Sequence, residues 1–542
     1  MLRIVDPSSW LLSKAERDNP QTVLDDVHAG QQAWSTGNLV IPLIHGSTYF
    51  RRLYDVVEAT RPGDLLFFTD WQGDADERLT GEPDSEVVEV FCRADERGVD
   101  VRGLVWRSHT DLTGFFAKEN RHFGEQMQQR GAEVLLDMRV RAGGSHHQKF
   151  VVVRHRDDPS RDVAFVGGMD LAHNRRDDAD HGGDPQPQPL TEEYGAHPPW
   201  HDVQVEIHGP AVYDVETVFR ERWEDPTPLS RSPLRKAVDL WRHHDTSPDG
   251  LPPQAPPPPP AGPHTVQLLR TYPDLRHGRD YPFARGGERS VARGYSKAIA
   301  RAERVAYVED QYFWGHDVAD PFESALRAHP ELRLVVVIPL VPDIAGLNRI
   351  PQLLGRERAL GRLMRAAPGR VAAYGLENRH GTPIYVHAKV CVIDDVWAST
   401  GSDNFNRRSW THDSEISCAI VDSTLDERPP RDPGGLGDGA RRLARDTRLR
   451  LWREHLGRDA LAGPDDDLVE PAAGFATLAR SAHALEDWYG GGCRGTRPPG
   501  RLRPHRPDRV AQWTRVVADP FSRAVLDPDG RPRTAGGRRS DR

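Results

Sequence analysis

The sequence predicts an α/β protein with two similar lobes, each a mixed β-sheet flanked by helices. Apolar runs typical of buried strands alternate with helical patterns along the chain. The same order of patterns occurs twice, and a proline-rich segment at residues 251–263, LPPQAPPPPPAGP, separates the two copies. The length of 542 residues also exceeds what one hydrophobic core usually organises.

The first copy opens with a helical pattern at residues 46–59, for which Ser47 or Thr48 is the expected N-cap. Strand patterns follow it at residues 64–71, 99–107, 147–153, 163–171 and 200–209. The second copy has a helix and a strand within residues 288–314, and strand patterns at residues 331–341, 387–393, 396–404 and 412–422. A duplicated domain is the simplest explanation.

These patterns divide the chain into regions. We expect an N-terminal lobe at residues 30–225, a linker at 226–264, a C-terminal lobe at 265–425 and an extension at 426–542. Within the extension, residues 440–457 predict an amphipathic helix that ends at Gly457. Residues 494–542 are rich in Arg, Pro and Gly and predict partial disorder.

Composition excludes several classes of protein. The formal net charge of -9 argues against a general nucleic-acid binder, which needs an excess of Lys and Arg. No run approaches the roughly 18 apolar residues of a spanning helix. The cysteines form no CxxC pair, and no secretory signal pattern opens the chain, so a cytoplasmic location is expected. The four cysteines are Cys92, Cys391, Cys418 and Cys493.

Each copy contains one HxK pattern, His147-Gln148-Lys149 and His387-Ala388-Lys389. Residues two apart on a strand share a face, so each pair presents an imidazole and an ammonium group together. One imidazole can attack phosphorus while a second protonates the leaving oxygen. The two lysines can stabilise the phosphoryl oxygens. Two HxK patterns at matching positions of a repeat are a strong signal for phosphodiester chemistry.

The sequences around the two HxK motifs resemble those of the phospholipase D superfamily. HAKVCVIDDVWASTGSDN fits the family pattern HxKxxxxD…GSxN, and HHQKFVVV, FVGGMDL and the segment from PWHDVQVEIHG onward resemble the first half of eukaryotic-type phospholipases D. The resemblance covers roughly residues 46–457. It implies two lobes around one pseudo-twofold active site, no metal or other cofactor, and a phosphohistidine intermediate. The supporting motif residues are Gly167, Gly168, Asp170, Asp394, Gly401 and Ser402.

The resemblance also implies individual roles. His147 is the expected nucleophile and His387 the general acid, which then becomes the base for water. Lys149, Lys389 and Asn404 are the expected phosphate ligands. A carboxylate on the strand after each Gly-rich turn holds a histidine, so we predict that Asp202 orients His147 and that Glu415 orients His387. Asp170 stands where Asn404 stands in the second copy and is expected to line the site without binding an anion well.

One position departs from the family pattern. Arg154 stands where the second copy has Asp394. We interpret it as a changed scaffold contact, compensated by Asp157 or Asp158. A damaged N-terminal half-site is the competing hypothesis.

Two further groups have uncertain roles at this stage. Residues 173–202 are rich in His and Asp but match no zinc template, so a solvated lid is favoured over a metal site, for which calcium is one option. His146 faces away from the site and is expected to be structural. Aromatic residues beside the predicted strands can either line a pocket or pack in the core; these are Trp71, Tyr312, Trp314 and Trp410.

The predicted function is a phospholipase D that hydrolyses a phosphatidylcholine-type glycerophospholipid to phosphatidic acid and a free headgroup. Its partners are the phospholipid, a membrane surface that it contacts peripherally, and water or an alcohol as acceptor, and the protein is expected to be a monomer. The alternatives are another enzyme of the superfamily, such as a nuclease or a cardiolipin synthase, and an inactive lipid-binding protein.

Overall fold

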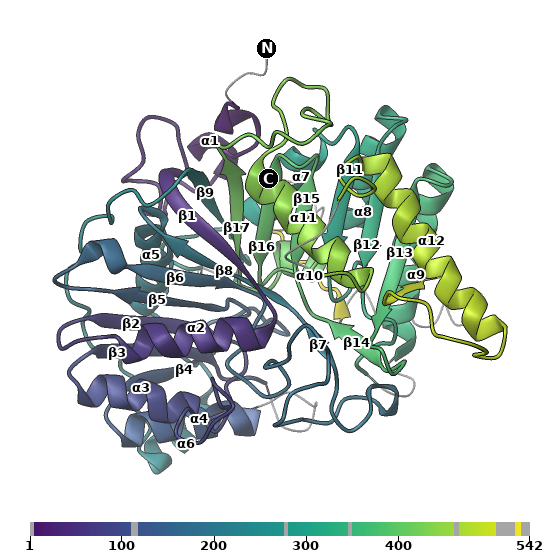
Figure 1. Cartoon of the computed structure of the whole chain (residues 1–542). Coiled ribbons are helices and arrows are strands. Elements are labelled where there is room, and N and C mark those ends of the chain that lie inside the picture. Colours follow the sequence, from purple (N-terminus) through teal and green to yellow (C-terminus); the bar gives the residue numbers. More distant parts are fainter. Residues whose placement is uncertain are drawn as a thin grey trace.

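Two β-sheets that lie side by side, with helices on their faces, form the protein (Figure 1). The computed structural model describes residues 5–109, 117–275, 280–344, 349–459, 465–505 and 526–532. Strand β1 (Ser35–Ile44) belongs to the first sheet and also pairs with β9 (His264–Tyr272) of the second. The predicted mixed α/β architecture is therefore confirmed, and the sheets are joined through equivalent strands.

The first sheet is antiparallel on one side and parallel on the other. Strands β1, β8, β6, β5 and β2 pair antiparallel in that order, and β2, β3 and β4 continue in parallel. The added bounds are β8 (Val203–His208), β6 (Val163–Gly167), β5 (Phe150–Arg154), β2 (Leu65–Asp70), β3 (Asp100–Trp106) and β4 (Glu133–Asp137).

The second sheet repeats this order and these directions. Strands β9, β17, β16, β15 and β11 pair antiparallel, and β11, β12 and β13 continue in parallel. Because both order and direction agree, the internal repeat read from the sequence is a repeat of the fold. The bounds are β17 (Glu415–Asp422), β16 (Trp397–Gly401), β15 (Val390–Ile393), β11 (Val305–Glu309), β12 (Arg333–Val337) and β13 (Val371–Glu377).

Short strands extend these sheets at their margins. Strand β10 (Glu288–Arg289) pairs with β9, and β13 also pairs with β14 (Pro383–Val386) and β18 (Leu502–Pro504). The expected disorder of residues 494–542 is wrong for β18, because this strand is paired with β13 in the sheet. Residues 506–525 and 533–542 of that tail lie outside the described residues.

The helices follow the repeat as well. Helices α2 to α4 and α7 to α9 connect the strands of the two lobes, α5 and α11 follow the last strand of each, and α12 lies beyond them. Their bounds are α2 (Gly46–Glu58), α3 (Val87–Glu96), α4 (Ala117–Gln129), α5 (Ala211–Trp223), α6 (Pro233–Arg242), α7 (Ser290–Ile299), α8 (His316–Ala328), α9 (Arg349–Ala366), α10 (Arg407–Thr411), α11 (Arg442–His455) and α12 (Pro471–Gly490); α1 spans Lys14–Arg17, and 3-10 turns occur at Pro7–Ser9, Pro159–Arg161 and Glu192–Tyr194.

Two helix ends test the sequence predictions. Helix α11 ends before Gly457, whose φ of 68° suits the predicted glycine stop. Helix α2 instead begins at Gly46 with His45 as N-cap, so the prediction of Ser47 or Thr48 is wrong. The reason is tertiary: the Ser47 N–H donates to the carbonyl oxygen of Asp177, in a distant segment, at 3.0 Å.

Alternate side chains of the central strands supply different cores. Leu66 and Phe68 of β2 pack under α2 and α3, whereas Phe67 between them packs with Phe219 of α5. The second of these cores also contains Ile416 and other apolar residues of the C-terminal sheet. Because side chains of both sheets belong to this core, apolar packing joins the lobes. Each buried side chain of this size contributes about 1.5–3 kcal/mol to the free energy of unfolding.

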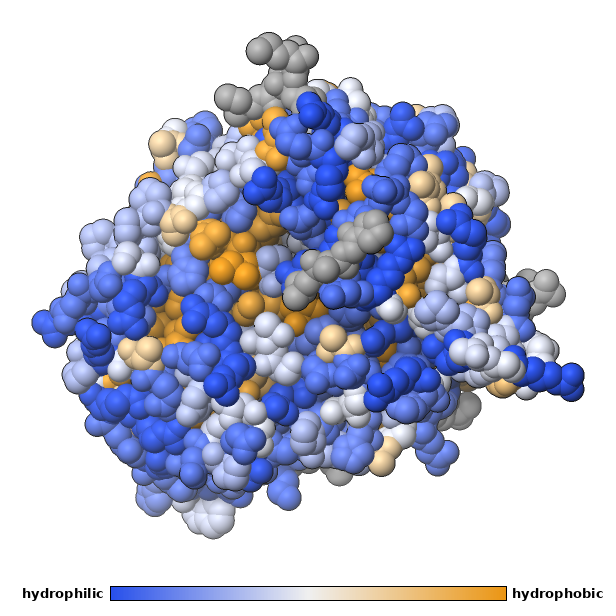
Figure 2. Space-filling model, in the orientation of Figure 1, coloured by the Kyte–Doolittle hydropathy of each residue, from blue (hydrophilic) through white to orange (hydrophobic). Residues whose placement is uncertain are grey.

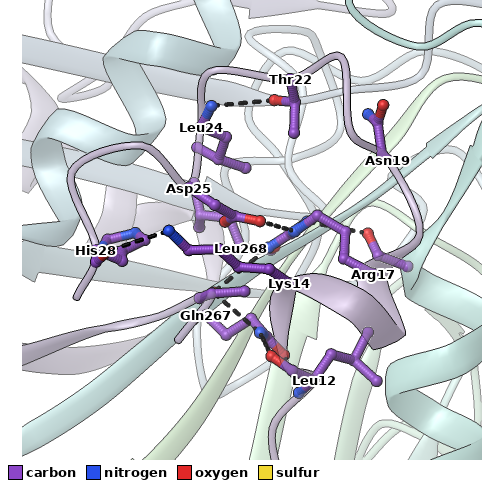
Figure 3. Close-up of polar contacts among 12 residues, drawn as sticks. Leu12, Lys14, Arg17, Asn19, Thr22, Leu24, Asp25, His28, Gln267 and Leu268 are labelled. Atoms are coloured by element: carbon purple, nitrogen blue, oxygen red, sulfur yellow. Dashed lines mark hydrogen bonds and ion pairs between the residues drawn. The ribbon is translucent and has the colours of Figure 1, made fainter. Parts of the chain in front are cut away.

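The N-terminal segment is attached to the C-terminal lobe (Figure 3). The side chain of Gln267, on β9, exchanges hydrogen bonds with the backbone of Leu12 at 2.7 and 2.8 Å. Buried Arg17 donates to Asp25 at 2.8 Å and to the carbonyl oxygen of Leu268 at 2.8 Å. The residues before β1 are therefore bound to β9, the strand of the second sheet that pairs with β1.

The face of the molecule shown in Figure 2 is mostly hydrophilic. On the face shown in Figure 2, apolar residues are visible chiefly in a band across the middle of the molecule, where the lobes meet. None of the helices that the structure describes is long and apolar enough to cross a membrane. All four cysteines are unpaired, and only Cys493 is exposed.

Asp394 of the second HxK motif is a structural residue. Its carboxylate accepts hydrogen bonds from the backbone N–H groups of Glu303, Arg304 and Val305 at 2.7 to 2.9 Å. These groups lie at the start of β11, so the carboxylate fixes the turn after β15 to the beginning of its neighbouring strand.

Arg154 makes a different set of structural contacts at the equivalent place. It is buried, donates to Asp162 at 2.7 Å and contacts Glu216. It also donates to the carbonyl oxygen of Pro256 at 2.7 Å, which holds the proline-rich linker against the first lobe. The scaffold interpretation of Arg154 agrees with these contacts. The expected compensation by Asp157 or Asp158 is wrong, because Asp162 and Glu216 are the partners.

We predict that Arg154→Asp destabilises the protein and does not increase its activity. The change leaves Asp162 without its buried cation and leaves Glu216 paired with Arg220, at 2.6 Å. Breaking a buried ion pair costs about 3–5 kcal/mol. Urea unfolding measures this loss, and Arg156→Asp at an exposed neighbouring position is the matched control. A gain of activity in Arg154→Asp would instead support the damaged half-site.

Candidate active site

Backbone pairing between the lobes brings the two HxK motifs together. The His147 N–H donates to the carbonyl oxygen of Ser414 at 2.9 Å, and the His387 N–H donates to that of His201 at 2.8 Å. Strand β14, which leads to His387, runs parallel to β7 (Trp200–His201) of the other lobe (Figure 1). A matching bridge pairs His146 with Ser414. Each motif is therefore hydrogen bonded to the opposite lobe.

This pairing exchanges the carboxylates that hold the two histidines. His147 Nδ1 lies 2.9 Å from Glu415 Oε2, and His387 Nδ1 lies 2.6 Å from Asp202 Oδ2. The prediction that each carboxylate serves the histidine of its own lobe is wrong. Glu415 follows Ser414 and Asp202 follows His201, so each backbone bridge places its carboxylate beside the histidine of the opposite lobe.

The Gly-rich turns allow this close approach. A Cβ atom on Gly168 would lie 2.5 Å from Asp202 Oδ1, and one on Gly401 would lie 2.0 Å from Ser417 Oγ. A Cβ on Gly167 would likewise lie 2.2 Å from the Gln204 side chain. In the second turn the Ser402 hydroxyl donates to Glu415 Oε2 at 2.5 Å. The motif residues therefore position the carboxylates, which in turn hold the rings.

The carboxylate contacts leave Nε2 of each ring as the nitrogen that can meet a substrate. Both rings line one cavity of about 500 Å³. Burial is the main cause that lowers the pKa of His387 well below its usual value, and the positive charges of Lys389 and Arg175 add to it. Without substrate, His387 is therefore held in its neutral form near pH 7.

The two lysines lie beneath the histidines. Lys149 Nζ donates to the carbonyl oxygen of His147 at 3.0 Å, and Lys389 makes the same contact with His387. Both side chains are buried. Burial, reinforced by the charge of Lys149, lowers the pKa of Lys389 to about 8. Each ammonium group thus contacts the backbone of one histidine, although neither lysine is among the residues that line the cavity.

Asp170 and Asn404 occupy equivalent positions but have different surroundings. Asp170 lies 3.4 Å from Lys149 Nζ and 3.0 Å from Arg175 Nη2. Burial opposes ionisation of Asp170, but these two cations together hold its pKa below the usual range. Asn404 lines the cavity, and its buried Oδ1 has no hydrogen-bond partner. Asn404 is therefore the one of the two that is available to a ligand.

The aromatic residues fall into two groups. Trp71, Tyr312 and Trp314 line the cavity, as one of the two predicted roles requires. Trp410 instead stacks on Tyr295 at 5.9 Å in the core of the C-terminal lobe. The cavity wall also includes Trp106, Trp200 and Tyr385, so apolar ring faces surround the imidazoles.

Residues 173–202 form part of the cavity wall. Asn174, Arg175 and Leu190 line the cavity, which supports a covering role for this segment. The expected solvated character is wrong for His181 and His201, which are buried, whereas Glu192 and His197 are exposed. His146 is buried outside the cavity lining and is hydrogen bonded to Gln148 at 3.3 Å, in agreement with its structural interpretation.

Two functional residues were missed in the sequence. Arg175 lines the cavity with its guanidinium 4.4 Å from the Trp200 ring centroid. Asp310 accepts backbone hydrogen bonds from Tyr312, Phe313 and Phe405 at 2.5 to 2.9 Å and so fixes the aromatic wall. Burial is the main cause that raises the pKa of Asp310 to about 6. The run of charged residues after Asn174 was the available signal for Arg175.

Family models match most of the region that contains these residues. A model described as phospholipase D matches residues 81–324. A second, described as cardiolipin synthase, PLD-like domain, matches residues 298–428. The two matches together include both HxK motifs and both orienting carboxylates.

Curated proteins with similar sequences include phospholipase D beta 2 of Arabidopsis thaliana, 26% identical, with 82% of this chain and 59% of that protein covered. Phospholipase D alpha 1 of Cynara cardunculus is 27% identical, with 73% and 62% covered. Phospholipase D alpha 1 of Zea mays is 26% identical, with 77% and 65% covered. The chain thus spans about three fifths of the length of these relatives.

Among solved structures, a phosphatidylserine synthase of Haemophilus influenzae aligns with a TM-score of 0.48 and 13% identity. The alignment covers 71% of this chain and 82% of that one.

The exchanged carboxylates generate a test by double-mutant cycles. We expect His147→Ala and Glu415→Gln to be coupled by about 0.5–3 kcal/mol in the free energy of unfolding, as residues in contact are. His387→Ala and Asp202→Asn should show the same behaviour. Urea unfolding of the single and double variants measures both couplings.

The control cycle combines His147→Ala with Asp202→Asn, the pair of the same lobe. It should be additive within about 0.5 kcal/mol. Stronger coupling within a lobe than between the lobes would contradict the exchanged arrangement.

Proposed function

The chain belongs to the phospholipase D superfamily, and we propose that it is a phospholipase D that cleaves a glycerophospholipid into phosphatidic acid and a free headgroup. The observation that carries this proposal is the pair of imidazoles in one cavity, each held through Nδ1 by a carboxylate of the opposite lobe. This leaves two Nε2 atoms for one phosphodiester, which is what displacement through a covalent intermediate requires.

In the first step His147 Nε2 attacks phosphorus with its lone pair. The bond from phosphorus to the headgroup oxygen breaks, and that oxygen takes the proton of His387 Nε2. In the second step neutral His387 accepts a proton from water, whose oxygen attacks phosphorus and displaces His147 Nε2. An alcohol in place of water gives transphosphatidylation. The assignment of His147 as nucleophile rests on the motif resemblance.

The charges around the cavity suit such a step. Lys149 and Lys389 are proposed to stabilise the phosphoryl oxygens from below, and Asn404 adds a side-chain amide at the cavity wall. Arg175 is near enough to lower the pKa of His387 and lies in the same wall. A bound phosphodiester brings a negative charge that offsets this effect and favours the protonated form of His387.

The walls support a lipid over a nucleic acid. Trp71, Tyr312 and Trp314 offer apolar faces for a headgroup or for the glycerol end of a lipid. The net charge of -9 disfavours a polyanionic strand. The runner-up is a phosphatidyltransferase of the cardiolipin synthase type, favoured by the second family model, at residues 298–428. A nuclease and an inactive lipid-binding protein are less well supported.

Peripheral contact with a bilayer is part of the proposal. Helix α6 exposes Leu234 by 76%, Leu240 by 80% and Trp241 by 76%. Exposed Leu and Trp beside basic residues such as Lys236 are typical of helices that lie at a membrane interface. Rates on vesicles should therefore exceed rates on monomeric short-chain lipid at equal concentration.

We predict that the protein releases choline from phosphatidylcholine vesicles and forms phosphatidyl-alcohol when a primary alcohol is added. His387→Ala should lose about 10²–10⁴-fold in rate, because it removes the proton donor. His147→Ala should lose at least as much and should not accumulate a phosphorylated enzyme. Chromatography of both lipid products measures the reaction.

His197→Gln, an exposed change in the cavity-wall segment, is the matched control and should retain activity. Cleavage of another phosphodiester without choline release would favour a different enzyme of the superfamily. Trapping of the phosphoryl label on His387 would reverse the two histidine roles.

The lowered pKa of His387 predicts the pH dependence. A general acid must carry its proton when substrate arrives, so kcat/KM should fall as pH rises through the pKa of His387 in the free enzyme. Because burial places that pKa below 6.5, the decline should begin on the acidic side of pH 6.5. Initial rates on a soluble phosphodiester between about pH 5 and 8 measure it.

The opposite roles give a different profile. If His387 were the nucleophile, it would have to be neutral, and the limb that it contributes to the profile would rise with pH instead of falling. The residual activity of His387→Ala should therefore lack the descending limb. Loss of an ascending limb in that variant would overturn the assignment of His387 as general acid while leaving the phosphodiesterase proposal in place.

A further inference from the structure

A second group of histidines lies behind the catalytic pair. Its members are buried, come from four separate parts of the chain, and place their ligand atoms within 4.8 Å of one another. None of them lines the substrate cavity. The group comprises His45 before α2, His181 in the cavity-wall segment, His201 of β7 and Glu454 of α11, and is called the four-ligand cluster below.

We propose that the four-ligand cluster binds one zinc-class divalent metal ion through three imidazole nitrogens and one carboxylate. Such a donor set is typical of tetrahedral zinc, whereas calcium and magnesium favour sites made of oxygen ligands.

Outer hydrogen bonds fix the tautomers of two rings. His181 Nδ1 lies 3.0 Å from the carbonyl oxygen of Trp200, which can only accept, so Nδ1 carries the proton. His201 Nε2 lies 2.8 Å from Glu309 Oε2 and donates to it in the same way. In the neutral form of each ring, the opposite nitrogen, His181 Nε2 or His201 Nδ1, carries the lone pair that a metal requires. Histidine ligands of metals usually have such partners on their second nitrogen.

Both lone pairs face the same carboxylate. His181 Nε2 lies 3.1 Å and His201 Nδ1 lies 3.5 Å from Glu454 Oε1. His201 Nδ1 is buried and has no hydrogen-bond partner. A lone pair directed at a carboxylate repels it, and either a proton on the ring nitrogen or a metal ion at the centre removes this repulsion.

The spacing of the donors suits tetrahedral zinc. Bonds of about 2.0–2.1 Å at tetrahedral angles put neighbouring donor atoms about 3.3 Å apart. Glu454 Oε2 lies 2.9 Å from His45 Nε2, and Glu454 Oε1 lies 3.1 Å from His181 Nε2 and 3.5 Å from His201 Nδ1. These separations are close to the spacing of zinc ligands, and all four ligand atoms lie within 4.8 Å of one another.

Buried carboxylates supply negative charge for a cation in this region. Glu454 and Glu309 are both buried and supply two negative charges beside the rings, and the buried Asp177 carboxylate lies 3.7 Å from His181 Nδ1. Glu309 belongs to the outer layer, since it also bonds to His455 Nε2 at 2.6 Å and to the Tyr307 hydroxyl. The competing account is metal-free: two protonated histidines would balance the same two carboxylates. The two accounts differ in whether the purified chain contains metal.

A metal here would stabilise the active site without touching the substrate. His201 accepts the His387 N–H at 2.8 Å, and Asp202, which orients His387, is its neighbour. Trp200 contacts the His387 ring, with ring centroids 5.0 Å apart. Zinc would connect α11, at the end of the C-terminal lobe, to β7 of the N-terminal lobe, so the ligands act as positioning residues.

The test measures metal in the full chain, purified without a metal-affinity tag. After exposure to excess Zn²⁺ and dialysis, elemental analysis should give about one zinc per chain, and a chelator that strips it should lower Tm. Co²⁺ loaded in its place should show the visible absorption bands of a tetrahedral site. These measurements need no variant and no enzymatic activity, so their outcome is independent of the proposed function.

Variants then locate the site. His181→Gln should lose the bound zinc, whereas His197→Gln, an exposed histidine of the same segment, should retain it. If the folded wild-type chain retains no stoichiometric zinc after exposure to Zn²⁺ and dialysis, the proposal is overturned in favour of protonated histidines. Full retention of zinc by His181→Gln would also overturn it, because the ion would then lie elsewhere.

Discussion

Two backbone hydrogen bonds between the lobes, from His147 N–H to Ser414 and from His387 N–H to His201, determine the geometry of the catalytic pair. Each bond places the following residue, Glu415 or Asp202, against the histidine of the other lobe. A pair of catalytic groups therefore forms only when both lobes are folded and in contact. Neither lobe contains a complete histidine and carboxylate pair of this kind within the described residues.

Buried ionic contacts hold both bridges from behind. On the side of Ser414, Arg222 of α5 donates to the Ser414 hydroxyl at 2.9 Å and to Asp137 at 2.7 Å. On the side of His201, Glu309 and Glu454 surround the ring. Burying a charged group costs several kcal/mol in desolvation, and ion pairs and hydrogen bonds offset this cost only when their geometry is good. Such contacts specify one relative position of the lobes more than they add stability.

The same logic accounts for the charged composition of the chain. Charged residues make up 28% of the sequence, and many of them lie inside. Asp395, for example, receives Arg445 at 2.8 Å and Arg448 at 2.6 Å, which attaches α11 to the end of β15. The net charge of -9 is an average over such balanced interior pairs and an outer surface. It does not describe the candidate active site, where Arg175 lines the cavity and each of two buried lysines contacts the carbonyl oxygen of one histidine.

The sequence alone determined the repeated α/β architecture and indicated the histidines and lysines of the candidate site, because strand periodicity and the HxK pattern are local properties. It also indicated that Arg154 is structural. Only the tertiary structure decided which carboxylate holds which histidine, because strands from opposite lobes pair there and no local pattern records that pairing. The histidines of the four-ligand cluster have no zinc spacing for the same reason: His45, His181, His201 and Glu454 come together through packing between elements that are distant in the chain.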